Sequence, residues 1–330
     1  MAISRARLLA RSLAGCTAIF ALAACSDNSG GSGLSPTLVA KGKDIFRFET
    51  FGDESFWTDT LRMHEVIEQA VDPTTALAVG LKVDTDSLPP EVVSAIQSGA
   101  ISLTDPATTV ALLKLNAVVG VKGTVQNING KDTLVRVGIT CALCHSTVDN
   151  SFAKGIGKRL DGWPNRDLNV GAIIALSPTL PPSAKAVYNS WGPGKYDPRF
   201  NFDGKNGPQV IPPAYGLLGI HKITSTGDGD DVAYWNRYVG VTQMHGHGSF
   251  DDPRIGVHVD NPPDIISPLL PALQEYQLSL NAPLLLREAS IPRRPAAATM
   301  CSPAPDSAPH VTRARCSPTP TSACTRPTKW

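Results

Sequence analysis

Five consecutive residues, Cys141-Ala142-Leu143-Cys144-His145, constrain the fold of this chain more than any other feature of its sequence. The Cys-x-x-Cys-His pattern is the attachment signature of c-type haem. On a helical turn, residues three apart face the same way, so both thiols can bond the vinyl groups of one porphyrin. The imidazole of His145 then reaches the iron as the proximal ligand. We therefore expect Cys141, Cys144 and His145 to bind haem c.

Two other kinds of site use a Cys-x-x-Cys pair. Structural zinc needs four ligands, and the part of the chain predicted to fold has no second Cys/His pair with suitable spacing. A thioredoxin-like dithiol belongs to a βαβ setting, which the sequence pattern does not indicate. Haem c is also assembled only after export, so an export signal at the N-terminus agrees with the haem interpretation.

The N-terminus has the pattern of such a signal. Arg5, Arg7 and Arg11 form a basic region before an apolar stretch over 13–24, which is too short to span a bilayer comfortably. That stretch ends at Cys25 in a Leu-Ala-Ala-Cys sequence resembling a bacterial lipobox. We predict a lipoprotein signal peptide over 1–24 and lipidation of the Cys25 thiol.

Residues 25–40 are predicted to form a flexible polar tether to the membrane, because they are rich in serine and glycine. Ser26 after the lipidated cysteine favours the outer membrane, which places the protein at the periplasmic face. Two alternatives remain open, a second lipobox match ending at Cys16 and an ordinary secretory signal. No other segment is long and apolar enough to be a transmembrane helix.

Composition indicates a folded, loop-rich chain. Apolar residues make up 42% of the 330, enough for a buried core, while glycine and proline number 28 each. The formal net charge of +1 gives no reason to expect a nucleic-acid partner. The fold class we predict is mainly α, a cytochrome c-like haem domain over 41–283 with long loops and a small β-hairpin.

Turn and capping signals place the expected elements around the haem motif. Asn129-Gly130 between two β-leaning runs, 121–128 and 133–139, predicts a hairpin that leads directly into Cys141. Proline pairs and glycines predict mostly loop from 155 to 213. Helices are expected over four stretches, namely 53–71, from Pro106 behind an Asp105 cap, 232–238, and 268–279 behind a Ser267 cap.

The sixth iron ligand is expected on a glycine-rich loop that carries Met244, His245 and His247. We take Met244 as the tentative ligand, because a thioether raises the reduction potential and suits electron transfer, whereas a histidine lowers it. Three further histidines stay open as alternatives, namely His64, His221 and His258. An empty sixth position would instead favour peroxide chemistry.

Three acidic residues offer oxygen ligands for calcium, namely Asp228, Asp230 and Asp231. The simpler interpretation is that they stabilise the N-terminus of the helix beginning near Val232, because carboxylates interact favourably with a helix N-terminus. Calcium is therefore the less favoured interpretation.

Three motifs carry a resemblance to a known family: the Cys141–Ser146 haem motif, the Gly162-Trp163-Pro164-Asn165 turn and the stretch Leu273–Leu280. On these residues the chain resembles bacterial cytochrome c proteins related to the di-haem cytochrome c peroxidase family, over about 41–283. Such proteins carry a second Cys-x-x-Cys-His domain after the last of these motifs, and this sequence has none there. The turn implies an aromatic residue, Trp163, packed near the porphyrin.

Residues 284–330 change in character, because they are rich in proline, arginine, serine and threonine and cannot bury a core. We predict a disordered tail. Synonymous codons for 307–312 also permit a shifted frame that encodes Cys-Ala-Thr-Cys-His, so an insertion or deletion near 284–290 could have displaced a second haem domain out of frame. This hypothesis would also explain three unpaired cysteines, Cys301, Cys316 and Cys324.

The expected function is one-electron transfer through a single covalent haem on the periplasmic side of a membrane, with a redox partner that the sequence does not identify. Two alternatives stay open. One is a di-haem peroxidase-like oxidoreductase that has lost its second haem domain, and the other is a haem-based sensor or binding module.

Overall fold

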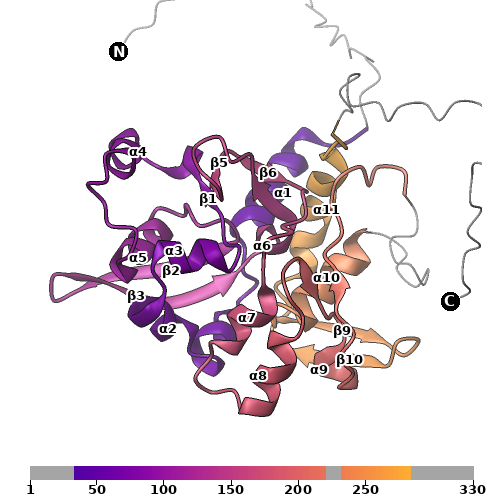
Figure 1. Cartoon of the computed structure of the whole chain (residues 1–330). Helices are drawn as coiled ribbons and strands as arrows, with labels where there is room; N and C mark the ends of the chain where they lie inside the picture. Colours follow the sequence, from indigo (N-terminus) through magenta and orange to yellow (C-terminus); the bar gives the residue numbers. More distant parts are fainter. Residues whose placement is uncertain (1–32, 221–231, 284–330) are drawn as a thin grey trace, which may run out of the picture. The chain divides into compact units, whose positions relative to one another are not determined.

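The computed structural model describes residues 33–220 and 232–283, in which helices and strands are mixed (Figure 1). About 41% of these residues are helical and about 18% lie in strands. The prediction of a mainly α fold is therefore wrong. Several segments that the sequence pattern predicts as loop contain short paired strands. Pairing gives the backbone N–H and C=O groups of neighbouring segments their hydrogen-bond partners.

The described strands form five two-stranded sheets. The longest pair is the predicted hairpin, β2 (Val121–Ile128) with β3 (Lys131–Ile139), in which Asn129 and Gly130 take the positive φ angles of the turn. The other pairs are shorter: β1 (Val83–Asp84) with β5 (Ile156–Gly157), which are parallel, and antiparallel β4 (Ser146–Val148) with β6 (Arg159–Asp161), β7 (Lys195–Tyr196) with β8 (Gln209–Val210), and β9 (Gly248–Asp252) with β10 (Val257–Asn261).

The described α-helices are mostly of one to three turns. They are α1 (Pro36–Phe48), α2 (Met63–Ala70), α3 (Pro73–Ala78), α4 (Pro90–Gln97), α5 (Pro106–Lys114), α6 (Ala142–His145), α7 (Val170–Ala175), α8 (Pro182–Asn189), α9 (Phe200–Asp203), α10 (Val232–Thr242) and α11 (Leu270–Ser279). Shorter or wider turns are the π-helix η1 (Ser55–Thr60) and the 3₁₀-helices η2 (Thr85–Ser87) and η3 (Ser267–Leu269).

Several expected helices are present. The helix from Pro106 is α5, and its Asp105 side chain accepts a hydrogen bond from Ala107 N at 2.9 Å as a cap. The helix near 232–238 is α10, which extends to Thr242. The helix expected over 268–279 begins later, at Leu270, and Ser267 lies in η3 rather than at its cap.

Other expectations differ from the structure. The continuous helix predicted over 53–71 is divided into η1 and α2, because Arg62 adopts a left-handed conformation with φ 54°. The stretch 155–213, predicted as mostly loop, contains α7, α8 and α9. At the N-terminal end, α1 already begins at Pro36 behind a Ser35 cap, so residues 36–40 of the predicted tether are helical.

The buried apolar residues form two clusters. The first core lies among α5, the β2–β3 hairpin, α7 and α8, and the second lies among α1, α10, β9 and α11. In the second core, α1 and α11 run side by side although they lie at opposite ends of the described sequence (Figure 1). The short helix α6 stands where the two cores meet, because Leu143 belongs to the first and Ala142 to the second.

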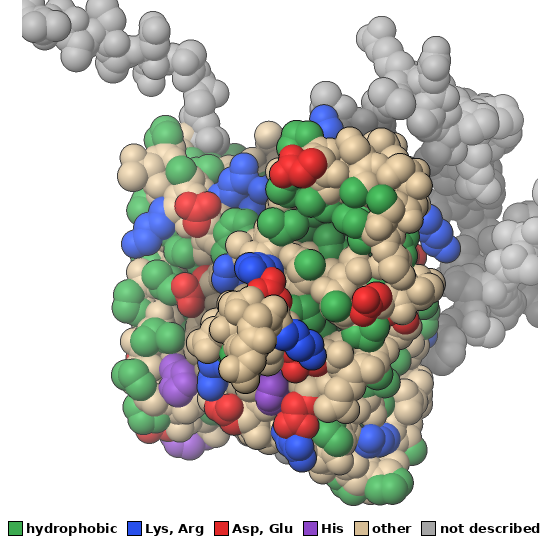
Figure 2. All heavy atoms as spheres, turned by 90° about the vertical axis from the view of Figure 1, so that its left-hand side faces the viewer, with side chains coloured by type: hydrophobic (Ala, Val, Ile, Leu, Met, Phe, Trp, Pro, Cys, Tyr) green, Lys and Arg blue, Asp and Glu red, His purple; other side chains and the backbone are tan. Residues whose placement is uncertain are grey.

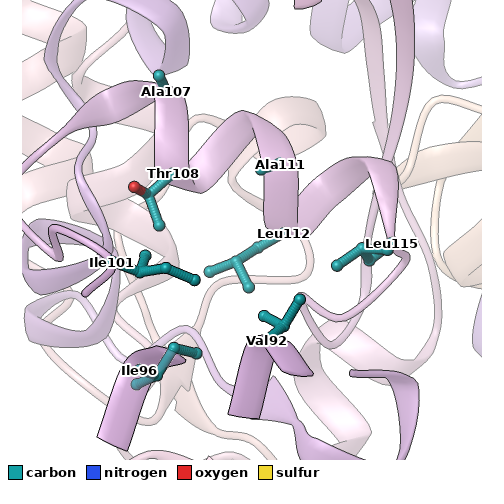
Figure 3. A pocket seen from close by; sticks show the side chains of 8 residues that line it. All are labelled: Val92, Ile96, Ile101, Ala107, Thr108, Ala111, Leu112 and Leu115. Carbon is teal, nitrogen blue, oxygen red and sulfur yellow. The ribbon is translucent and has the colours of Figure 1, made fainter. Parts of the chain in front are cut away.

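The surface of the face shown in Figure 2 mixes basic and acidic side chains with apolar ones. None of the helices in residues 33–220 and 232–283 has the length and apolar character needed to span a bilayer. An apolar cavity of about 300 Å³ lies between α4 and α5, and Figure 3 shows the side chains around it. Its lining has no titratable or metal-ligating group: Val92, Ile96, Ile101, Ala107, Thr108, Ala111, Leu112 and Leu115.

Candidate cofactor site

The Cys-x-x-Cys-His residues lie on one helical turn. Cys141 has helical backbone angles (φ −52°, ψ −30°) and precedes α6, which ends at His145. The hairpin strand β3 ends at Ile139, two residues before Cys141. Between them, the Thr140 hydroxyl donates a hydrogen bond to Arg47 O at 3.1 Å. Gly120, with φ 76°, allows the close approach, since a Cβ there would overlap the Leu143 backbone nitrogen.

The two thiols are not joined in a disulfide, and each borders a different core. Cys141 lies against the second core and Cys144 against the first. Burial raises the pKa of each thiol to about 12. Since the thiolate is the nucleophilic form, this environment opposes a redox-dithiol role at neutral pH.

His145 is held in one tautomer by a backbone carbonyl. Its Nδ1 lies 3.1 Å from Pro212 O, and a carbonyl only accepts hydrogen bonds, so Nδ1 carries the proton and donates it. The Nε2 lone pair is then available to a metal. Burial lowers the pKa of His145 to about 4, so the ring is neutral at neutral pH.

The Gly162-Trp163-Pro164-Asn165 turn closes the end of α6. Gly162 N donates to His145 O at 2.8 Å, and Asn165 N donates to Cys144 O at 2.9 Å. The Asn165 side chain is buried and donates to Gly80 O at 2.9 Å. Trp163, expected near the porphyrin, is 37% exposed and its ring centroid lies 5.6 Å from that of Tyr215. The residues of this turn that contact the motif are therefore Gly162 and Asn165, both through their backbone nitrogens.

The loop expected to carry the sixth ligand follows α10. Met244 is 3% exposed and belongs to the second core, the one that Cys141 borders. His245 has a left-handed backbone with φ 63°, and its ring stacks on Phe56 with centroids 3.6 Å apart. A non-glycine residue held in this conformation is often found at functional sites.

Beside this loop is a cavity of about 430 Å³, a volume typical of small-molecule and cofactor sites. Its lining combines one imidazole with mainly apolar side chains: Phe56, Thr60, Leu61, Thr179, Leu180, Tyr188 and His245. Burial lowers the pKa of His245 to about 4, so this ring is also neutral at neutral pH.

The remaining candidate ligands have other partners or lie elsewhere. His247 Nδ1 donates to Pro262 O at 3.1 Å, and the exposed His258 pairs with Asp251 at 3.1 Å. His64 lies on α2 beside Glu65 at 3.9 Å. Among the described residues, no group of three or more His, Cys, Asp or Glu side chains is placed to hold a metal ion by itself.

Several predicted sites lie outside the described residues. They are Cys25 and Cys16, His221, the acidic residues Asp228, Asp230 and Asp231, and the tail with Cys301, Cys316 and Cys324.

The donor set of the motif is the one that a covalently bound haem requires. The chain presents two unlinked thiols on one turn, an imidazole with a free Nε2, and apolar surroundings. The buried polar atoms without a hydrogen-bond partner include Asn165 Oδ1 beside the motif, and Trp57 Nε1 next to Phe56, whose ring stacks on His245. Unsatisfied buried polar atoms are uncommon and are consistent with a group that completes the site.

No protein-family model, curated protein or solved structure matches this chain.

The neutral imidazoles lead to a testable pH dependence in haem-free protein, prepared without residues 1–24. We expect His145 and His245 to titrate near pH 4 instead of 6.5. Between these values each of the two imidazoles binds more protons in the unfolded chain than in the folded one, so the two histidines should lower the free energy of unfolding by a few kcal/mol as pH drops from about 6.5 to about 4. Histidine NMR titration and urea unfolding measure the two effects. His145→Gln and His245→Gln should each remove part of the slope, and unshifted titrations near 6.5 would contradict the expected burial.

Proposed function

We propose that this protein is a c-type cytochrome that binds one covalent haem through Cys141, Cys144 and His145 and transfers electrons on the periplasmic side of a membrane. The observation that carries the proposal is the His145 Nδ1–H donated to Pro212 O, 3.1 Å away, directly after two unlinked thiols. This hydrogen bond leaves Nε2 free and orients the ring, as second-shell partners do for metal-bound histidines.

The bound haem would supply a one-electron iron couple. The chain would provide the attachment, the orientation and the exclusion of water. The two thiols would fix the cofactor at the junction of the two cores, where Leu143 and Ala142 are buried on either side. Low polarity and limited solvent access are two of the means by which a protein sets a haem potential.

The proposal keeps Met244 as the sixth ligand. Two observations support this choice. Met244 belongs to the second core, against which Cys141 packs, and the next residue, His245, has a left-handed backbone that constrains the loop. His245 lies one residue away along the cavity and is the alternative ligand.

Replacing Met244 by alanine is expected to lower the haem reduction potential, because methionine ligation raises it. A spectroelectrochemical titration measures the change. Met63→Ala is the matched control, since Met63 is also buried but belongs to the first core. A potential that moves equally in both variants would show that Met244 acts through packing rather than as a ligand.

Export, lipidation at Cys25 and attachment at the outer membrane belong to the same proposal, supported by the N-terminal sequence pattern. So does the likeness to bacterial cytochromes related to di-haem cytochrome c peroxidases, which rests on the three sequence motifs. The electron donor and acceptor would be periplasmic redox proteins.

The deciding experiment is a pyridine haemochrome spectrum with haem-to-protein stoichiometry, on protein from an exporting host that matures haem c. We expect one haem per chain that survives denaturation. A colourless denatured protein with two titratable thiols in the motif would refute the proposal. Peroxide turnover by the same sample would favour the peroxidase-like alternative, and a redox-idle spectrum that shifts with a small gas would favour a sensor.

A further inference from the structure

A buried carboxyl group stands beside the candidate site and has no part in the proposed attachment. Asp53 lies between α1 and η1 and is 0% exposed. Both of its carboxyl oxygens lie 3.2 Å from the backbone nitrogen of Ile139, the last residue of β3 and two residues before Cys141. A Cβ on Gly138 would overlap Asp53 Oδ1, so the strand packs directly against the carboxyl group.

The charges that face Asp53 are acidic. Glu49 and Glu54 lie on the same segment and are half-buried, and Glu54 accepts a hydrogen bond from the Thr50 hydroxyl at 2.8 Å. No basic side chain pairs with Asp53 in the described part of the chain, and Arg47 pairs with Asp161 at 2.6 Å. Burial therefore raises the pKa of Asp53 well above its usual range, and the charges of Glu54 and Glu49 raise it further.

The segment that carries Asp53 contacts both the end of β3 before the motif and the loop expected to carry the sixth ligand. On one side, Arg47 O accepts from the Thr140 hydroxyl next to Cys141. On the other, Phe51 O accepts from His247 N at 2.7 Å, and the His247 ring lies against Gly52. Burial is the main cause of the raised pKa of the Cys141 thiol, and the negative charges of Asp53 and Glu49 raise it further. Asp53 is therefore close enough to the motif to interact with it electrostatically.

We propose that Asp53 binds one proton when the cofactor is reduced and releases it on oxidation, so that electron transfer by this protein is coupled to proton transfer. The inference rests on the proposed function. One electron comes from a one-electron donor protein and one proton from solvent, and an O–H bond forms on the carboxylate. On oxidation the electron leaves to the acceptor, the O–H bond breaks and the proton returns to solvent.

The physical reason is the change of charge next to a desolvated acid. Oxidised haem carries one more positive charge than reduced haem, and a nearby positive charge favours the carboxylate. Loss of that charge on reduction leaves Asp53 with acidic neighbours and a single amide donor, which favours the neutral acid.

The test is the reduction potential as a function of pH for the holoprotein and for Asp53→Asn, which keeps an acceptor oxygen for Ile139 but cannot ionise. Asp53 should have one pKa in the oxidised protein and a higher pKa in the reduced protein. Between these two values the reduction potential of the wild type should fall as pH rises, by up to about 59 mV per pH unit. That slope corresponds to one proton bound per electron, since a tenfold change in an equilibrium constant equals about 59 mV for one electron. Asp53→Asn should remove this slope. Asp59→Asn is the matched control, because Asp59 is 58% exposed and pairs with Arg136, and it should keep the slope.

A second measurement needs no variant. Reduced-minus-oxidised infrared spectra of the wild type, with ¹³C-labelled aspartate, should gain a carboxylic acid C=O band that shifts in D2O and lose a carboxylate band. A redox-active haem with no such band, or an unchanged pH slope in Asp53→Asn, would overturn the coupling and leave the proposed function intact. If the protein carries no covalent haem, there is no haem redox couple to titrate, and both proposals would be refuted.

Discussion

The double substitution Cys141→Ala and Cys144→Ala is expected to abolish covalent haem binding in a host that matures haem c. The two thiols are the groups that would form the thioether bonds, and both lie on the turn that begins at Cys141 and ends at His145. Haem that remains with the chain after denaturation, measured by haem staining and the pyridine haemochrome, should fall from one per chain to background. Each single variant should keep one bond and an intermediate amount of haem.

The control for this experiment is Cys301→Ser, which removes a cysteine outside the motif. It should leave the haem content unchanged. Retention of haem by the double variant would mean that another pair of groups holds the cofactor, and the assignment of the site would be wrong.

Gly42→Ala should destabilise the protein strongly. A Cβ at Gly42 would overlap the Ala272 carbonyl oxygen and lie 2.7 Å from Tyr276 Cβ, so α1 and α11 would have to separate. Overpacking of this kind typically costs 1–3 kcal/mol, and we expect about 3 kcal/mol because backbone atoms are involved. Helix propensity alone predicts the opposite sign, since alanine stabilises a helix interior relative to glycine by about 1 kcal/mol.

Urea unfolding measures the effect as a lower midpoint with an unchanged slope. Gly207→Ala is the matched control, because a Cβ there would meet no atom within 4 Å. Its midpoint should stay close to that of the wild type. A Gly42→Ala variant more stable than the wild type would show that α1 and α11 are less closely packed than the structure indicates.

The parts of the fold that could be predicted from sequence are those with local causes. The hairpin follows from Asn129-Gly130, whose positive φ angles suit the turn, and α5 follows from the Asp105 cap before Pro106. At α8 a local signal points both ways. Pro181-Pro182 favours a loop, but proline is also well suited to the first turn of a helix, and Pro182 occupies that position.

The other differences have long-range causes. The helix predicted over 53–71 is interrupted at Arg62, and the η1 segment before it is bonded to β3, because Thr58 exchanges hydrogen bonds with Val137, 79 residues away. In the same way, the sequence places the haem motif but not the carbonyl that orients His145, because Pro212 is 67 residues away. Phe56 and Asp53 carry no local signal for a role at the site, since their partners come from other elements.

The pairing of the first and last described helices has a consequence for maturation. Ser35 and Glu275 are joined by a hydrogen bond across 240 residues, so the second core cannot be completed until the chain is available as far as α11. Cys141 borders that core, and its thiol is poorly reactive once enclosed. Attachment enzymes would therefore act on a chain that is still open, and folded apoprotein should not acquire its porphyrin afterwards.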